Sequence, residues 1–131
     1  MEALPALGDA WGLILQPVVL GYLVLGVLMG LCIGVFPGLG GIAGLSLLLP
    51  FMFGMEPVLG LALMIGMVAV VPTSDTFASV LMGIPGSSAS QATVLDGFPM
   101  AKKGQAARAL SAAFASSLFG GLVGATFLTV F

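Results

Sequence analysis

The residues best suited to bind a ligand surround a single carboxylate, Asp75, which lies between two apolar stretches at 58–71 and 77–84. Its neighbours carry hydroxyl groups, so the cluster consists of Thr73, Ser74, Asp75 and Thr76. A carboxylate with nearby hydroxyls offers hard oxygen ligands to a cation, and an ionisable group at membrane depth is itself a candidate proton site. The same residue types also cap helix N-termini, so Asp75 is alternatively the cap of a helix that begins at Thr76. The cluster is therefore a candidate cation site, with helix capping as the other interpretation.

Two Pro-Gly sequences form a second kind of candidate site. The first reads Pro-Gly-Leu-Gly-Gly from position 37, and the second reads Pro-Gly-Ser-Ser-Ala-Ser from position 85. Proline removes a backbone donor and glycine permits positive φ, so both sequences predict a break in a helix. In secondary transporters such helix ends point backbone dipoles at anionic substrates or coupling ions. The candidate substrate-binding residues are Pro37, Gly38, Gly40, Gly41, Pro85, Gly86, Ser87, Ser88 and Ser90. For the second sequence, a small-residue turn at the membrane interface is the alternative.

The inventory of other reactive residues disfavours an enzyme. The chain has no His, and its one cysteine, Cys32, lies within an apolar run, so a general base, a zinc site and a disulfide lack the residues they need. Residues 38–43 match the dinucleotide pattern G-x-G-x-x-A formally, but they follow a long charge-free helical stretch rather than a short strand. We expect no catalytic residues, no metal centre and no cofactor.

The composition is that of a membrane protein. Hydrophobic residues make up 60% of the 131 positions and charged residues only 6%, against about 25% charged residues in a typical globular chain. The mean hydropathy is +1.25. So few charges cannot solvate a compact globule, so most of the surface must meet lipid or other protein. Three basic residues are also too few for a nucleic-acid interface.

The elements expected to position these residues are helices. Residues 18–36 form an uninterrupted apolar run long enough to span a bilayer, with Gly26, Gly30 and Gly34 on one face for close helix packing. The stretch 18–53 is too long for one upright span and short for two, which predicts a broken or re-entrant helix at the first Pro-Gly sequence. Further on, the pattern predicts a marginal span at 58–71, a polar break at 72–76, a short apolar piece at 77–84 and a last span at 109–131. This last span has a small-residue packing face made of Gly120, Gly121, Gly124, Ala113, Ser116 and Ser117.

The remaining segments set boundaries and orientation. Residues 1–17 predict an interfacial helix anchored by Trp11, and they do not resemble a cleaved signal peptide. Asp96-Gly97 and Pro99 indicate a turn that leads into a short helix, which Gly104 ends. The basic residues of this region, Lys102, Lys103 and Arg108, favour a cytoplasmic loop, with substrate binding as the less favoured alternative.

Three sequence strings together resemble the tripartite tricarboxylate transporter permease family, specifically its large membrane subunit. They are GVFPGLGG at 34–41, GIPG at 83–86 and DGFPMAKKG at 96–104, and the last string is the most specific. The resemblance covers residues 18–131. It implies a secondary transporter for tricarboxylates or related organic anions in the bacterial inner membrane, with segments 37–41 and 85–90 in the substrate pathway. It also implies coupling to a cation, sodium or a proton. Many members of the family carry Gly-Ser-Thr-Thr where this chain has Thr73-Ser74-Asp75-Thr76, so the Asp75 cluster is a candidate coupling-ion site from its own residue types and not from the resemblance.

The resemblance also implies partners: a small membrane subunit and a periplasmic solute-binding protein. Permeases of the family are several times longer than this chain, so we expect a single membrane domain that corresponds to an N-terminal portion. Residues 1–17 would be its interfacial part and 18–131 its transmembrane part. An assembly subunit without transport activity and a channel are the alternatives. A membrane-embedded enzyme is disfavoured because the chain has no convincing acid–base pair.

Overall fold

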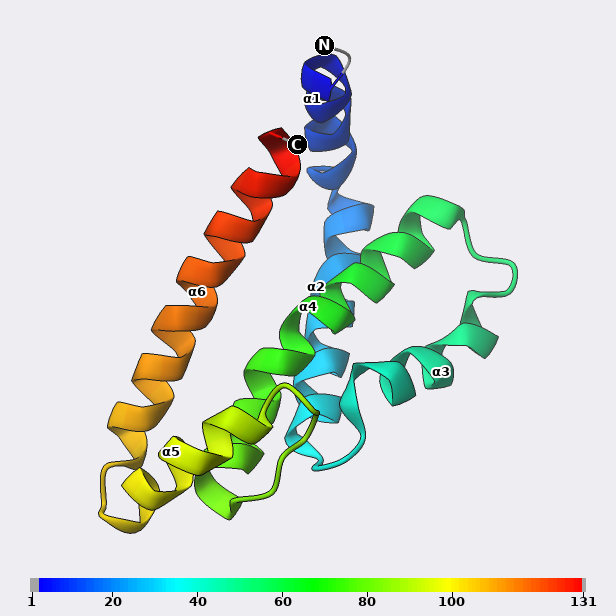
Figure 1. The fold of residues 1–131 in the computed structure, drawn as a ribbon. Coiled ribbons are helices and arrows are strands. Elements are labelled where there is room, and N and C mark those ends of the chain that lie inside the picture. Colours follow the sequence, from blue (N-terminus) through cyan, green and yellow to red (C-terminus); the bar gives the residue numbers. More distant parts are fainter. Residues whose placement is uncertain (1–2, 131) are drawn as a thin grey trace.

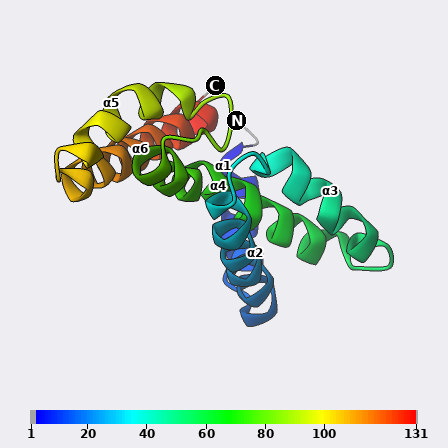
Figure 2. The same ribbon diagram turned by 90° about the horizontal axis from the view of Figure 1, so that it is seen from below.

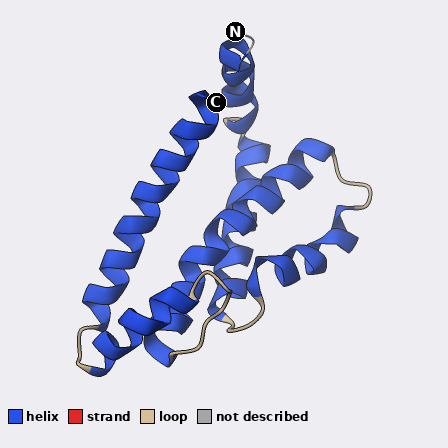
Figure 3. Cartoon of the chain, in the orientation of Figure 1, coloured by secondary structure: helices blue, strands red, loops and turns tan. Residues whose placement is uncertain are grey.

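The fold, given by a computed structural model that describes residues 3–130, is built only of helices in that part of the chain (Figures 1 and 3). In order they are α1 (Ala3–Ile14), α2 (Pro17–Val35), α3 (Gly40–Met52), α4 (Pro57–Met82), α5 (Gln91–Lys102) and α6 (Ala106–Val130). Of these, α2, α4 and α6 are long and apolar enough to cross a membrane. The prediction of an all-α membrane protein is confirmed.

The centre of the fold is the packing of α2 against α4 (Figures 1 and 2). Gly26, Gly30 and Gly34 are all buried at this contact. A β-carbon placed at Gly30 would lie 2.5 Å from the Met67 carbonyl oxygen, so only glycine lets the two backbones approach this closely. The glycine stripe predicted to pack therefore does so, and it fixes α4 in place along α2.

A small apolar core extends from this contact toward α3. Leu48 of α3 is buried together with Leu63, Met67 and Val71 of α4. Dispersion contacts and close fit hold such a cluster together, because in a bilayer the hydrophobic effect does not distinguish lipid from protein. The core positions α3 beside the face of α4 that leads to Asp75.

The first Pro-Gly sequence breaks the chain as predicted. Helix α2 ends at Val35 and α3 begins at Gly40, with positive φ at Gly38 and Gly40. Helix α3 has 13 residues, or about 20 Å of helix, which is too short to cross a hydrocarbon core of about 30 Å. It therefore turns away from α2 as a partial helix, as Figure 2 shows.

The predicted break at 72–76 is wrong. Helix α4 runs without interruption from Pro57 to Met82, through Pro72, and ends at Gly83, whose φ of 69° gives a left-handed C-cap. A proline in a buried helix removes one backbone hydrogen bond, and packing against neighbouring helices tolerates that loss. Two of the hydroxyls that suggested a polar loop, those of Ser74 and Thr76, instead bond back to the helix, and Thr76 Oγ1 donates to the Pro72 carbonyl at 3.2 Å.

The predicted turn at Asp96-Gly97 is also wrong, because both residues and Pro99 lie inside α5. Gly97 is buried, and a β-carbon there would lie 2.8 Å from Val80 Cγ2 of α4. The glycine thus serves close packing of α5 on α4 rather than a turn. Gly104 follows the helix with a φ of 77° and ends it, as predicted.

Helix α6 begins three residues earlier than predicted and lies along the outside of the fold (Figure 1). Its ring contact is Phe114 with Phe77 of α4, at 5.3 Å between centroids. β-carbons placed at Gly120, Gly121 and Gly124 would meet nothing within 4 Å. The glycines of the predicted small-residue face therefore make no close contact among the described residues, whereas Ser117 of that face has its Oγ 3.5 Å from Thr73 Oγ1 of α4. The interfacial position of residues 1–17 stays a prediction, and the exposed Trp11 of α1 is compatible with it.

Candidate functional site

Asp75 lies inside α4, in the last third of the helix, and is only 1% exposed. It is not at a helix start, so the capping interpretation is wrong. Its Oδ1 accepts a hydrogen bond from Ser79 Oγ at 3.4 Å, and the same hydroxyl also approaches the Asp75 carbonyl at 3.1 Å. The other carboxylate oxygen, Oδ2, is buried and has no hydrogen-bond partner. A buried carboxylate with an unsatisfied oxygen is costly unless a cation or proton completes it.

The second Pro-Gly sequence lies directly on this carboxylate. Gly86 is buried, and a β-carbon there would lie 2.9 Å from Asp75 Cβ and 3.2 Å from Oδ2. The φ of Gly86 is not positive. Glycine is therefore needed at this position for space rather than for backbone conformation. The loop 83–90 covers the Asp75 side chain with its main chain.

The first Pro-Gly sequence meets the second at the same place. A β-carbon at Gly40 would lie 3.7 Å from the Gly86 carbonyl oxygen, and one at Gly41 would contact Val71 of α4. Pro37 and Gly38 are exposed on the connection between α2 and α3. The structure thus brings Gly40, Gly86 and Asp75 together from three separate parts of the sequence.

The three hydroxyl neighbours of Asp75 form their hydrogen bonds elsewhere. Ser74 Oγ lies within hydrogen-bond distance of the Gly30 carbonyl at 3.3 Å and of two carbonyls of its own helix. Thr73 Oγ1 lies 3.5 Å from Ser117 Oγ of α6, and Thr76 bonds to Pro72 as described above. Ser79 is the hydroxyl partner that the sequence analysis missed. Its position four residues after Asp75 was the available signal, because residues i and i+4 share one helix face.

The serines of the second break close a turn. Ser90 is buried, its Oγ accepts a hydrogen bond from the Ser87 N–H at 3.1 Å, and it donates to the Ser87 carbonyl at 2.9 Å. Ser88 is exposed on the same loop. Helix α5 begins directly after this turn, and no side chain caps its N-terminus. The N–H groups of its first turn therefore have no side-chain acceptor.

The basic residues lie at the corner between α5 and α6. Lys102, Lys103 and Arg108 are all exposed, and Lys102 Nζ lies 4.5 Å above the ring of Phe98. That ring packs against Gly83, where a β-carbon would lie 2.8 Å from Phe98 Cδ1. These contacts hold α5 against the end of α4, next to the loop 83–90.

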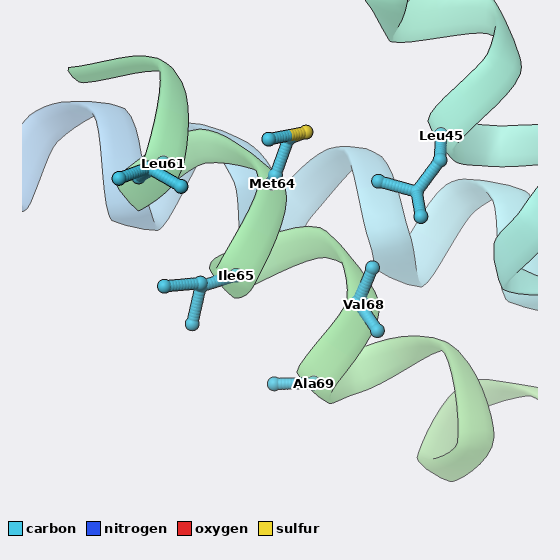
Figure 4. Close-up of a pocket in the computed structure, with 6 residues that line it drawn as sticks. All are labelled: Leu45, Leu61, Met64, Ile65, Val68 and Ala69. Atoms are coloured by element: carbon cyan, nitrogen blue, oxygen red, sulfur yellow. The ribbon is translucent and has the colours of Figure 1, made fainter. Parts of the chain in front are cut away.

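Neither a cluster of metal ligands nor the groove between α3 and α4 adds a polar group to this site in the described part of the chain. No group of three or more His, Cys, Asp or Glu side chains gathers within residues 3–130. A groove of about 410 Å³ lies between α3 and α4, and Figure 4 shows its wholly apolar lining of Leu45, Leu61, Met64, Ile65, Val68 and Ala69. An anion would find no polar partner there, so the groove is unsuited to a charged substrate.

The fold and site define an all-α membrane protein in which two helix breaks converge on a buried carboxylate. Comparison with known sequences makes this assignment specific. The chain belongs to the tripartite tricarboxylate transporter TctA family, whose model matches residues 20–131. A curated protein of Agrobacterium vitis, described as an uncharacterized 52.8 kDa protein in the TAR-I ttuC′ 3′ region, is 36% identical over 116 residues. The match covers 88% of this chain and 23% of that relative. No solved structure matches the chain.

Proposed function

We propose that this chain forms part of a permease subunit that takes up tricarboxylates or related organic anions together with a cation. The convergence of Gly40, Gly86 and Asp75 carries the proposal. Both helix breaks expose main-chain dipoles, and the loop 83–90 adds the hydroxyls of Ser87 and Ser88. These groups bind a carboxylate without a buried countercharge.

The buried carboxylate gives a physical reason for cation coupling. The substrate is an anion, and an uncompensated negative charge on Asp75 beside it repels it strongly in a medium of low dielectric constant. A sodium ion or a proton at Asp75 removes that repulsion. Binding of the cation then raises the affinity for the anion, and by reciprocity the anion raises the affinity for the cation.

Membership of a tripartite family supports the partners of the proposed permease. We propose that the permease works with a small membrane subunit and a periplasmic solute-binding protein in the bacterial inner membrane, as a multi-pass symporter. The exposed face of α6, with its three glycines, is available for contact with other membrane helices.

Uptake of radiolabelled citrate tests this proposal. The native protein that carries this sequence is reconstituted in liposomes with its two partners, under an imposed sodium or proton gradient. We expect Asp75→Asn to abolish the dependence of uptake on the gradient, while the protein still inserts. Asp9→Asn on α1, at an exposed carboxylate, is the matched control and keeps the dependence.

Two results would contradict the proposal. Uptake with an unchanged gradient dependence in Asp75→Asn removes Asp75 from the coupling step. Flux of citrate without the binding protein and without any gradient indicates a channel instead.

A further inference from the structure

The side chain of Asp75 and the loop 83–90 are in direct contact, so a cation bound to the carboxylate would also lie against the loop. Gly86 lies on the carboxylate side chain, and the loop carries five of the candidate substrate residues, Pro85, Gly86, Ser87, Ser88 and Ser90. A ligand of Asp75 Oδ2 must therefore enter beside the loop main chain. Once bound, it lies between α4 and the loop.

We propose that Asp75, Ser79 and the main chain around Gly86 form a site for one monovalent metal cation, and that the bound cation holds the loop 83–90 closed over α4. The link to substrate binding rests on the function proposed above, whereas the cation site and its effect on the loop do not.

The donor set fits a singly charged metal ion. Asp75 Oδ2 is buried without a partner, Oδ1 lies beside Ser79 Oγ, and no nitrogen or sulfur donor contributes. The site holds one carboxylate, because the other acidic side chains whose burial the structure describes, Asp9, Glu56 and Asp96, are all exposed. Divalent cations bind to sites with several charged oxygens, so one carboxylate with neutral oxygens favours sodium.

The loop can supply the missing neutral oxygens. Within the described residues, the Gly86 carbonyl accepts no hydrogen bond from a backbone N–H. Carbonyls outside helices are common cation ligands in broken-helix transporters. A cation bound jointly by Asp75 of α4 and by loop carbonyls would cross-link the two segments. Without the cation, Asp75 Oδ2 has no hydrogen-bond partner, so no polar contact joins it to the loop.

Gly86 is in this view a positioning residue. Because its φ is not positive, alanine there is strained only by the contact with Asp75. Gly86→Ala therefore separates loop and carboxylate without otherwise disturbing the backbone, and it serves as a second, independent variant beside Asp75→Asn.

The test measures the accessibility of the loop to a water-soluble maleimide. Cys32 of the native protein is first replaced by Ser. In this background Ala89→Cys places a label site on the exposed part of the loop, and Gln105→Cys places the control site at the exposed α5–α6 corner. Labelling of the Cys32→Ser protein alone is subtracted. Rates are compared in sodium chloride and in choline chloride at equal ionic strength, without substrate or partner subunits.

We expect sodium to slow labelling at position 89 at least about threefold and to leave position 105 unchanged, an effect of about 0.7 kcal/mol on the closed loop. Asp75→Asn and Gly86→Ala should each remove the sodium effect. The same rate in both salts, or sodium protection that persists in both variants, would overturn the proposal. Sodium protection in a protein that takes up no citrate would leave this site standing and reject the transport proposal. Citrate uptake by a protein that shows no sodium protection of position 89 would reject the cation site and leave the transport proposal standing.

Discussion

Gly86 lies against Asp75 so closely that a β-carbon at position 86 would be 2.9 Å from Asp75 Cβ, 3.0 Å from Cγ and 3.2 Å from Oδ2. The two residues are 11 positions apart and belong to different elements, a loop and the last third of a helix that is long and apolar enough to cross a membrane. Their contact joins the only buried charge of the described chain to the loop that carries the second Pro-Gly sequence. The predictions below follow from this contact and from the helix packing that holds it in place.

A larger side chain in place of glycine at the two Pro-Gly breaks should impair uptake more than one in place of glycine on α6. Gly40→Val forces a branched side chain into positive φ, and Gly86→Val collides with Asp75. Gly120→Val meets nothing within 4 Å. We expect citrate uptake to fall at least about tenfold in the first two variants, or 1.4 kcal/mol and more, and far less in the third. Equal losses in all three variants would indicate that the glycines serve packing alone.

The α2–α4 contact should be sensitive to a single methyl group. Gly30→Ala places a β-carbon 2.5 Å from the Met67 carbonyl oxygen, and overpacking of this kind costs about 1–3 kcal/mol. Gly21→Ala lies on the same helix, is exposed and has no neighbour within 4 Å. Both variants gain the same helix propensity. Thermal unfolding in detergent should show a lower midpoint for Gly30→Ala only, and an equal midpoint in the two variants would count against the close packing.

The hydroxyl of Ser79 should contribute to the affinity for the cation. Ser79→Ala removes the hydrogen bond to Asp75 Oδ1 and one neutral oxygen of the site. A loss of about 1 kcal/mol corresponds to about a fivefold higher sodium concentration at half-maximal uptake. Ser111→Ala, at an exposed hydroxyl bonded to the Ala107 carbonyl on α6, is the control. A half-maximal concentration that is the same in Ser79→Ala and wild type would remove Ser79 from the site.

Replacement of Pro72 tests whether α4 is continuous. Pro72→Ala restores a backbone donor within an uninterrupted helix, so we expect correct insertion and an unfolding free energy that is higher by up to about 3 kcal/mol. The measurement is the unfolding midpoint of the purified protein, compared with that of Pro99→Ala in α5. If residues 72–76 instead formed a loop between two helices, Pro72→Ala would bring no gain in stability.

The sequence determined the class of the protein and most of its helices by itself. Apolar runs of bilayer length without charges have one stable solution in lipid, a helix with all backbone groups bonded internally. The first Pro-Gly break and the packing role of Gly26, Gly30 and Gly34 follow from local chemistry as well, since only glycine gives both positive φ and a flat helix face. A specific string of residues was enough to indicate the family.

The tertiary structure decided what happens at Asp75. Local propensity alone favours a break at Pro72 and a cap at Asp75. In the structure α4 packs along α2 and stays intact, and the loop 83–90 lies over the Asp75 carboxylate, which is buried. Likewise the pair Asp96-Gly97 is typical of a turn, but in the structure Gly97 lies inside α5, where it packs closely against Val80 of α4. The meeting of Gly40, Gly86 and Asp75 depends on how three segments fold back on one another. No pattern in the sequence contains that contact, because it arises from close packing between residues far apart in the chain.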